Sequence, residues 1–188
     1  MHDFFPASAA TARVVALVTD EHLDLPTPCE AWPVRDLLEH IAGFTAHFAA
    51  IGRREQMTGE PPASGLPDGW RTMLADALED LTLAWRTPGA WDGEDTAGGT
   101  TMPRAALGVV ALDELLLHGW DLATAIGVPF AASADDVQIC LPFVEQFSGM
   151  TGGPFAAPRP GAQEAEGLDR LLLLSGRDPA IGSDDGVG

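Results

Sequence analysis

Two histidines and a glutamate, all able to bind a metal ion, stand where the amphipathic pattern of the sequence requires apolar side chains. Residues 102–126 form the longest apolar segment and are predicted to be a helix. On a helical wheel, Glu114, His118 and Asp121 fall in the middle of an apolar stripe. The opposite side of this helix is also apolar, so Glu114 and His118 should be buried or line a cavity. A buried carboxylate is costly unless it is paired or ligated, so Glu114 requires a partner.

His40 shows the same anomaly on the apolar face of a second predicted helix, residues 34–57. Glu114 and His118 are one helical turn apart, so both side chains can reach a common point, and His40 would join them from a facing helix. Two imidazoles and one carboxylate form a three-ligand set with open positions, which is typical of catalytic zinc. The same donors suit Ni, Co, Fe or Mn. The alternative is a core pair in which a neutral histidine hydrogen-bonds the glutamate without any metal.

Three further polar residues are predicted to support these ligands. Asp36 and Asp121 are placed to orient the histidine rings, with a salt bridge to Arg35 as the alternative. His47 lies on the same helix face as His40. It is interpreted as a supporting group, with a fourth ligand or an ordinary helix residue as the alternatives.

The two cysteines are too few for a disulfide framework. Cys29 could act as a nucleophile, but its sequence neighbours offer no cation to lower the pKa of its thiol. We therefore favour a buried packing role for Cys29. Cys140 lies in an apolar stretch and is predicted to be a core residue.

Six segments show helical periodicity and strand patterns are short, so the predicted fold class is an all-α bundle. The segments are residues 8–22, 34–57, 70–86, 102–126, 134–147 and 163–174. Ser8 and Ser133 are expected to cap helices, and Pro142 to kink or break the fifth one. Residues 87–101 are predicted to be a loop. We expect a helical bundle over residues 1–150 and, over 151–188, a C-terminal extension whose short helix packs on it.

The charge balance excludes several classes of partner. The 188 residues include ten arginines, no lysine and 28 acidic residues, for a formal net charge of −18. Such a chain repels phosphate backbones and anionic lipids, so we expect neither nucleic acid nor a membrane as partner. The sequence has no apolar run long enough to span a bilayer and no signal-peptide pattern at its start, so a cytoplasmic location is expected.

Two motifs and the C-terminal stretch resemble one protein family over nearly the whole chain. Residues 27–40 read TPCEAWPVRDLLEH, residues 113–123 read DELLLHGWDLA, and residues 171–179 end in GRDP. These resemble actinobacterial DinB-like proteins of the single-domain branch. That group is related to the metal-binding N-terminal domain of mycothiol-dependent maleylpyruvate isomerase.

The resemblance implies a four-helix bundle of up-down-down-up type with one or two extra C-terminal helices. It also implies a divalent metal, zinc before the others, held by His40, Glu114 and His118. The implied partner is a low-molecular-weight thiol, mycothiol, activated by the metal in an S-transferase or isomerase. The chain has no room for the isomerase's second domain, so a transferase is favoured. The alternative is a non-catalytic metal-binding or protein-interaction bundle. Helical bundles pair readily through long faces, so a homodimer is a further expectation.

Overall fold

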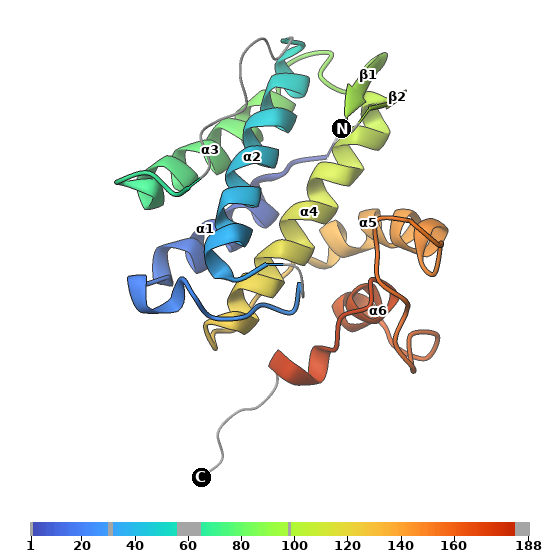
Figure 1. The fold of residues 1–188 in the computed structure, drawn as a ribbon. Helices are drawn as coiled ribbons and strands as arrows, with labels where there is room; N and C mark the ends of the chain where they lie inside the picture. The colour runs from blue at the N-terminus through green and yellow to red at the C-terminus, as the bar shows by residue number, and fades with distance from the viewer. Residues whose placement is uncertain (1, 30–31, 56–64, 98, 183–188) are drawn as a thin grey trace.

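Four helices form the central bundle of the computed structural model, which describes residues 2–29, 32–55, 65–97 and 99–182 (Figure 1). They are α1 (Phe5–Leu17), α2 (Val34–Arg53), α3 (Trp70–Trp85) and α4 (Arg104–Ala125). Helices α1 and α2 each pack against both α3 and α4. A one-turn 3-10 helix, η1 (Asp20–His22), follows α1. The bundle predicted from the sequence is therefore confirmed.

The directions of the four helices follow from the contacts at the end of α3. The ring of Phe4, just before α1, lies 5.4 Å from the Trp85 ring, so α1 and α3 are antiparallel. The Trp85 indole Nε1 donates a hydrogen bond to the Phe48 carbonyl near the end of α2, so α2 and α3 are parallel. Gly108, in the first turns of α4, lies against Trp85, so α4 runs opposite to α3. The order is up-down-down-up, as predicted.

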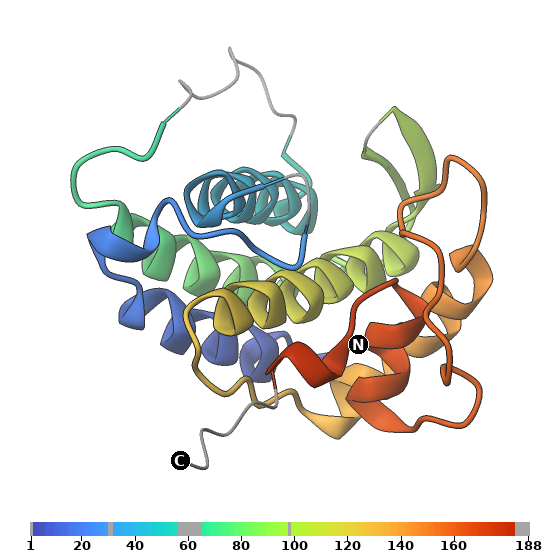
Figure 2. The same cartoon turned by 60° about the horizontal axis from the view of Figure 1, so that its bottom comes forward.

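Two further helices extend the bundle on the α4 side (Figure 2). Helix α5 (Ala134–Phe147) packs against α4, and α6 (Gly167–Leu174) packs against α5. A last 3-10 turn, η2 (Pro179–Gly182), returns to contact both α6 and α4. The segment beyond α6 therefore lies beside the bundle, next to the helix that carries Glu114 and His118.

Helix α5 confirms the predicted cap and excludes a break at Pro142, one of the two predicted effects of that proline. The Ser133 hydroxyl caps it by accepting from the backbone N–H of Asp136 at 3.5 Å, as predicted. Pro142 does not break it, because the helix continues to Phe147. The carbonyl that Pro142 leaves without a helical donor belongs to Gln138, which is exposed, so water can serve it.

Other element boundaries differ from the sequence prediction. Helix α1 begins at Phe5 with a proline in its first turn, where the missing N–H costs nothing. Ser8 is therefore a buried residue inside the helix and not its cap. The predicted loop 87–101 contains part of a small hairpin of β1 (Glu94–Ala97) and β2 (Thr100–Pro103). Helix α2 ends at Arg53, and the predicted end at Met57 lies outside the described residues.

Helix α4 is the centre of the core. Its apolar residues are buried on more than one side, among them Leu107, Leu112, Leu115 and Leu116. Gly119 allows close packing, because a Cβ there would lie 2.7 Å from the Thr11 hydroxyl oxygen. None of the described helices is both long enough and apolar enough to cross a bilayer.

Candidate metal centre

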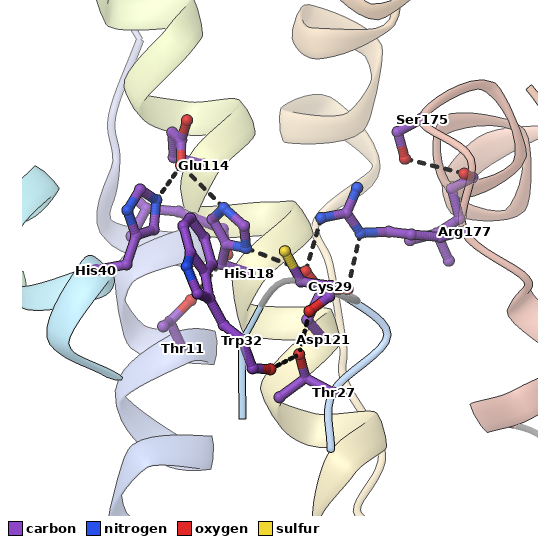
Figure 3. A network of polar contacts seen from close by, with 12 residues as sticks. Thr11, Thr27, Cys29, Trp32, His40, Glu114, His118, Asp121, Ser175 and Arg177 are labelled. Carbon is purple, nitrogen blue, oxygen red and sulfur yellow. Dashed lines mark hydrogen bonds and ion pairs between the residues drawn. The ribbon is translucent and has the colours of Figure 1, made fainter. Parts of the chain in front are cut away.

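Helices α2 and α4 bring the three predicted ligands together (Figure 3). His40 Nε2 lies 2.9 Å from Glu114 Oε2, and His118 Nε2 lies 3.1 Å from the same oxygen. The two imidazole rings meet edge to face, with centroids 4.8 Å apart. Two nitrogens from different helices thus converge on a single carboxylate oxygen.

The spacing of these atoms is compatible with a metal ion. One ligand atom from each of His40, Glu114 and His118 lies within 4.8 Å of the others. Ligand bonds of about 2.1 Å in tetrahedral geometry place two ligand atoms roughly 3.4 Å apart. The 2.9 Å and 3.1 Å separations are slightly shorter than this value, so small side-chain movements would open room for a cation.

The protonation of Glu114 and His118 reflects their mutual contacts. Burial raises the pKa of Glu114, but hydrogen bonds from His118 and His40 outweigh it and lower the pKa to about 2. Burial lowers the pKa of His118, but hydrogen bonds to Asp121 and Glu114 outweigh it and raise the pKa to about 8. Without a metal, the proton on His118 supplies the positive charge between two carboxylates. A divalent cation would replace that proton.

Asp121 connects the histidine to the C-terminal segment. Its fully buried carboxylate lies 3.0 Å from His118 Nδ1. Arg177, three residues after α6, donates to both Asp121 oxygens, with distances of 2.8 Å and 2.6 Å. The proposed alternative for Asp121, a salt bridge to Arg35, is wrong, because Arg35 lies 3.6 Å from Asp24. Asp121 thus fixes which His118 nitrogen faces Glu114.

A second group of ligand-type atoms shares His118. Sγ of Cys29, a ring nitrogen of His118 and a carboxylate oxygen of Asp121 lie within 4.8 Å of one another. Arg177 already supplies a cation to Asp121 on this side. Of the two groups, the one with His40 and Glu114 is therefore the better candidate for a metal.

The other two predicted supporting residues lie elsewhere. Asp36 is exposed in the first turn of α2, and His47 is half-buried two turns after His40. The His47 ring contacts the ring of Phe48, with centroids 5.5 Å apart. Among the described residues, neither belongs to a group of converging ligand atoms.

A loop before α2 covers the site. The Trp32 ring stacks on His40, with centroids 4.5 Å apart and planes 29° from parallel. The Thr27 hydroxyl holds this loop, lying 2.7 Å from the Trp32 carbonyl and 3.0 Å from the Cys29 carbonyl. Residues 30–31 of the same motif lie outside the described residues. The motif that includes TPC and Trp32 therefore shields one side of His40.

A cavity of about 660 Å³ opens onto the three ligands. Phe143, Phe155, Arg159 and Ser175 also line it. Cys29 lines it too and is only half-buried, so the prediction of a buried packing residue is wrong. The loop before α2 places the Cys29 side chain at the cavity wall, and the neighbouring residues in the sequence do not indicate this.

Asp113 is a buried acid in the same cavity wall. Burial, aided by the neighbouring charge of Glu114, raises the pKa of Asp113 to about 8. Its Oδ1 has no hydrogen-bond partner among the described residues. Asp113 and Arg177 are the site residues that sequence reasoning missed, although both lie inside the motifs that carried the resemblance.

Comparison with known proteins identifies the family of this chain. The family model described as Mycothiol maleylpyruvate isomerase N-terminal domain matches residues 4–123, a span that includes all three candidate ligands. The chain belongs to this family. The chain is also 29% identical over 180 residues to an uncharacterized protein of two Mycobacterium tuberculosis strains, CDC 1551 / Oshkosh and H37Rv. That match covers 91% of this chain and 93% of the relative.

Solved structures of the family share the fold. The crystal structure of the mycothiol-dependent maleylpyruvate isomerase, and that of a histidine-to-alanine mutant, match with a TM-score of 0.58 at 19% identity. The match covers 81% of this chain and 70% of the isomerase chain. Arg177 lies beyond the residues that the family model matches, and in this structure it contacts Asp121.

Proposed function

We propose that this member of the family is a metal-dependent enzyme that activates a low-molecular-weight thiol of the mycothiol type. His40, Glu114 and His118 would hold the divalent cation, with zinc preferred and Ni, Co, Fe or Mn as the alternatives. The observation that carries the proposal is the convergence of two imidazole nitrogens on one glutamate oxygen at the edge of an open cavity.

The chemistry of the donor set supports a cation at this point. The lowered pKa of Glu114 keeps its carboxylate ionised at neutral pH. Asp121 accepts at His118 Nδ1, which leaves Nε2 on the side of Glu114 and His40. Three protein ligands leave positions open for an exogenous group, and the cavity leads to them.

A bound divalent metal would lower the pKa of a thiol coordinated to it, so that the thiolate predominates near neutral pH. The protein's own residues then bind and orient. Trp32 covers one face of the His40 ring, and Phe143 and Phe155 contribute apolar surface to the cavity lining. The Arg177–Asp121 pair holds the His118 ring in place. No protein nucleophile is required for this chemistry.

The family relation supports a thiol as the partner, since the related isomerase is described as mycothiol-dependent. For the reaction, we favour S-transfer to an electrophile over isomerisation. The match covers 70% of the isomerase chain, and the remainder of that chain lies outside the match. The open cavity supports an enzyme over a closed, non-catalytic metal-binding bundle.

Metal analysis of purified protein tests the ligand set. We expect one divalent ion per chain, and its loss in the His118→Ala variant. His22→Ala is the matched control, because His22 lies in η1, away from this cluster, and should retain the metal. Full occupancy in His118→Ala would refute the ligand assignment.

The thiol part is tested separately on cobalt-substituted protein. Titration with mycothiol should produce a thiolate-to-cobalt charge-transfer band that saturates at one thiol per metal. A metal-loaded protein that shows no such band would overturn thiol activation while leaving the metal site intact.

A further inference from the structure

The two cysteines occupy opposite environments. Cys140 lies in α5 with no exposed surface, and burial raises the pKa of its thiol. Cys29 lies in the loop before α2, is half-buried and lines the cavity. A small molecule that enters the cavity can therefore reach Cys29 but not Cys140.

The position of Cys29 within the cavity is fixed by its neighbours. Its carbonyl accepts from the Trp32 N–H at 2.9 Å and from the Thr27 hydroxyl at 3.0 Å. Its Sγ lies within 4.8 Å of ligand-type atoms of His118 and Asp121 (Figure 3). An adduct on this sulfur would extend into the space next to His118.

A separate observation points to a ligand with hydrogen-bonding groups in the cavity. Asp113 is only 4% exposed, lines the cavity, and its Oδ1 has no hydrogen-bond partner among the described residues. A buried oxygen without a partner is unfavourable, and such groups in native structures call for an explanation. A hydroxyl or amide group on a ligand in the cavity, which can both donate and accept, would supply the missing partner.

We propose that Cys29 is a thiol–disulfide exchange site for small-molecule disulfides that carry hydroxyl or amide donors. The Cys29 sulfur attacks one sulfur of the disulfide R–S–S–R. The bond between the two R-bound sulfurs breaks as the Cys29–S–S–R bond forms, and the other half leaves as R–SH with the proton that Cys29 gives up. The disulfide is the oxidant, so no further co-reactant is needed.

Exchange at Cys29 would make the site sensitive to redox conditions. The mixed disulfide occupies the cavity beside His118, so it excludes a thiol from the open metal positions. This consequence rests on the proposed function, whereas the exchange itself does not. Excess free thiol reverses the adduct and reopens the cavity.

The test uses 2-hydroxyethyl disulfide and intact-mass measurement on the purified wild type, Cys29→Ser and Cys140→Ser. We expect a single mercaptoethanol adduct on the wild type and on Cys140→Ser. The remaining cysteine of Cys29→Ser should react at least about tenfold more slowly, because it is buried. Modification of Cys29→Ser at the wild-type rate, or no adduct on the wild type, would overturn the proposal.

A second comparison distinguishes a binding site around Cys29 from a thiol that is merely exposed. Diethyl disulfide has a similar shape and lacks the hydroxyls. The rate of each probe with the folded wild type is divided by its rate with the urea-unfolded chain, and this ratio should be about tenfold larger for 2-hydroxyethyl disulfide. Asp113→Ala should abolish this preference. Equal rates with both probes on the folded wild type would mean adventitious exposure and overturn the site. Metal content, measured in parallel, reports on the proposed function independently.

Discussion

Replacing Arg177 with methionine should expose how much the C-terminal segment contributes to the stability of the site. The Asp121 carboxylate has no exposed surface, and the Arg177 side chain is only 11% exposed. Two hydrogen bonds join them, so the substitution leaves a buried carboxylate with His118 as its remaining partner. Breaking a buried ion pair in this way costs about 3–5 kcal/mol. Because the His118 contact persists, we expect a loss near 3 kcal/mol.

For a chain of this length, a loss of that size lowers the melting temperature by roughly 6–12 °C. The assay is thermal unfolding followed by circular dichroism, with urea unfolding to obtain the free energy. Arg170→Met is the matched control, since Arg170 pairs with Glu145 at the surface, where such pairs contribute at most about 1 kcal/mol. The double variant Arg177→Met with Asp121→Asn removes the buried charge and should regain about 1–2 kcal/mol. If Arg177→Met and Arg170→Met destabilise equally, the buried-pair reasoning is wrong.

Two further predictions concern packing and pH. Gly119→Ala places a methyl group within 2.7 Å of neighbouring side-chain atoms, so it should lower the free energy of unfolding in urea by about 1–3 kcal/mol. Gly43→Ala is the control: its methyl group would have nothing within 4 Å, and it should stabilise α2 by up to about 1 kcal/mol. In metal-free protein, the contribution of His118 is complete below its ordinary pKa of 6.5 and is lost as the pH rises through about 8. The contribution of Glu114 is complete above 4.5 and is lost as the pH falls towards about 2. Burial raises the pKa of Asp113 from 3.8 to about 8, so this group also lowers stability as the pH rises. Stability should therefore fall from pH 5.5 to pH 9, and greater urea resistance at pH 9 than at pH 5.5 would contradict the assignments of both His118 and Asp113.

The helical pattern of the sequence was sufficient to predict that the three candidate ligands lie close together. Glu114 and His118 stood out because polar residues interrupted an otherwise apolar helix, and His40 stood out for the same reason on α2. Four of the six helices were predicted close to their observed bounds, because the apolar residues of a long amphipathic helix recur with the helical period. The family relation confirmed the fold that these patterns indicated.

Features made by loops and distant segments were not predictable in the same way. Arg177 reaches Asp121 from 56 residues away, and no periodicity links an irregular segment to a helix. Cys29 was assigned to packing because sequence neighbours alone cannot show which loop side chain faces a cavity. The start of α1 was placed too late because Ser8 looked like a cap, although Pro6 already suits a first turn.

The contact between Arg177 and Asp121 also has a consequence for the order in which the protein is made. The ribosome releases the four helices of the bundle before it releases Arg177, so α4 begins to fold while its buried carboxylate still lacks the arginine. Until then, His118 is the partner that remains to Asp121, so α4 is held in the core less stably. A nascent or truncated chain that ends before Arg177 would keep this part of the bundle loosely packed and open to proteases. The carboxylate that orients His118 therefore gains its second partner only after Arg177 has been synthesised.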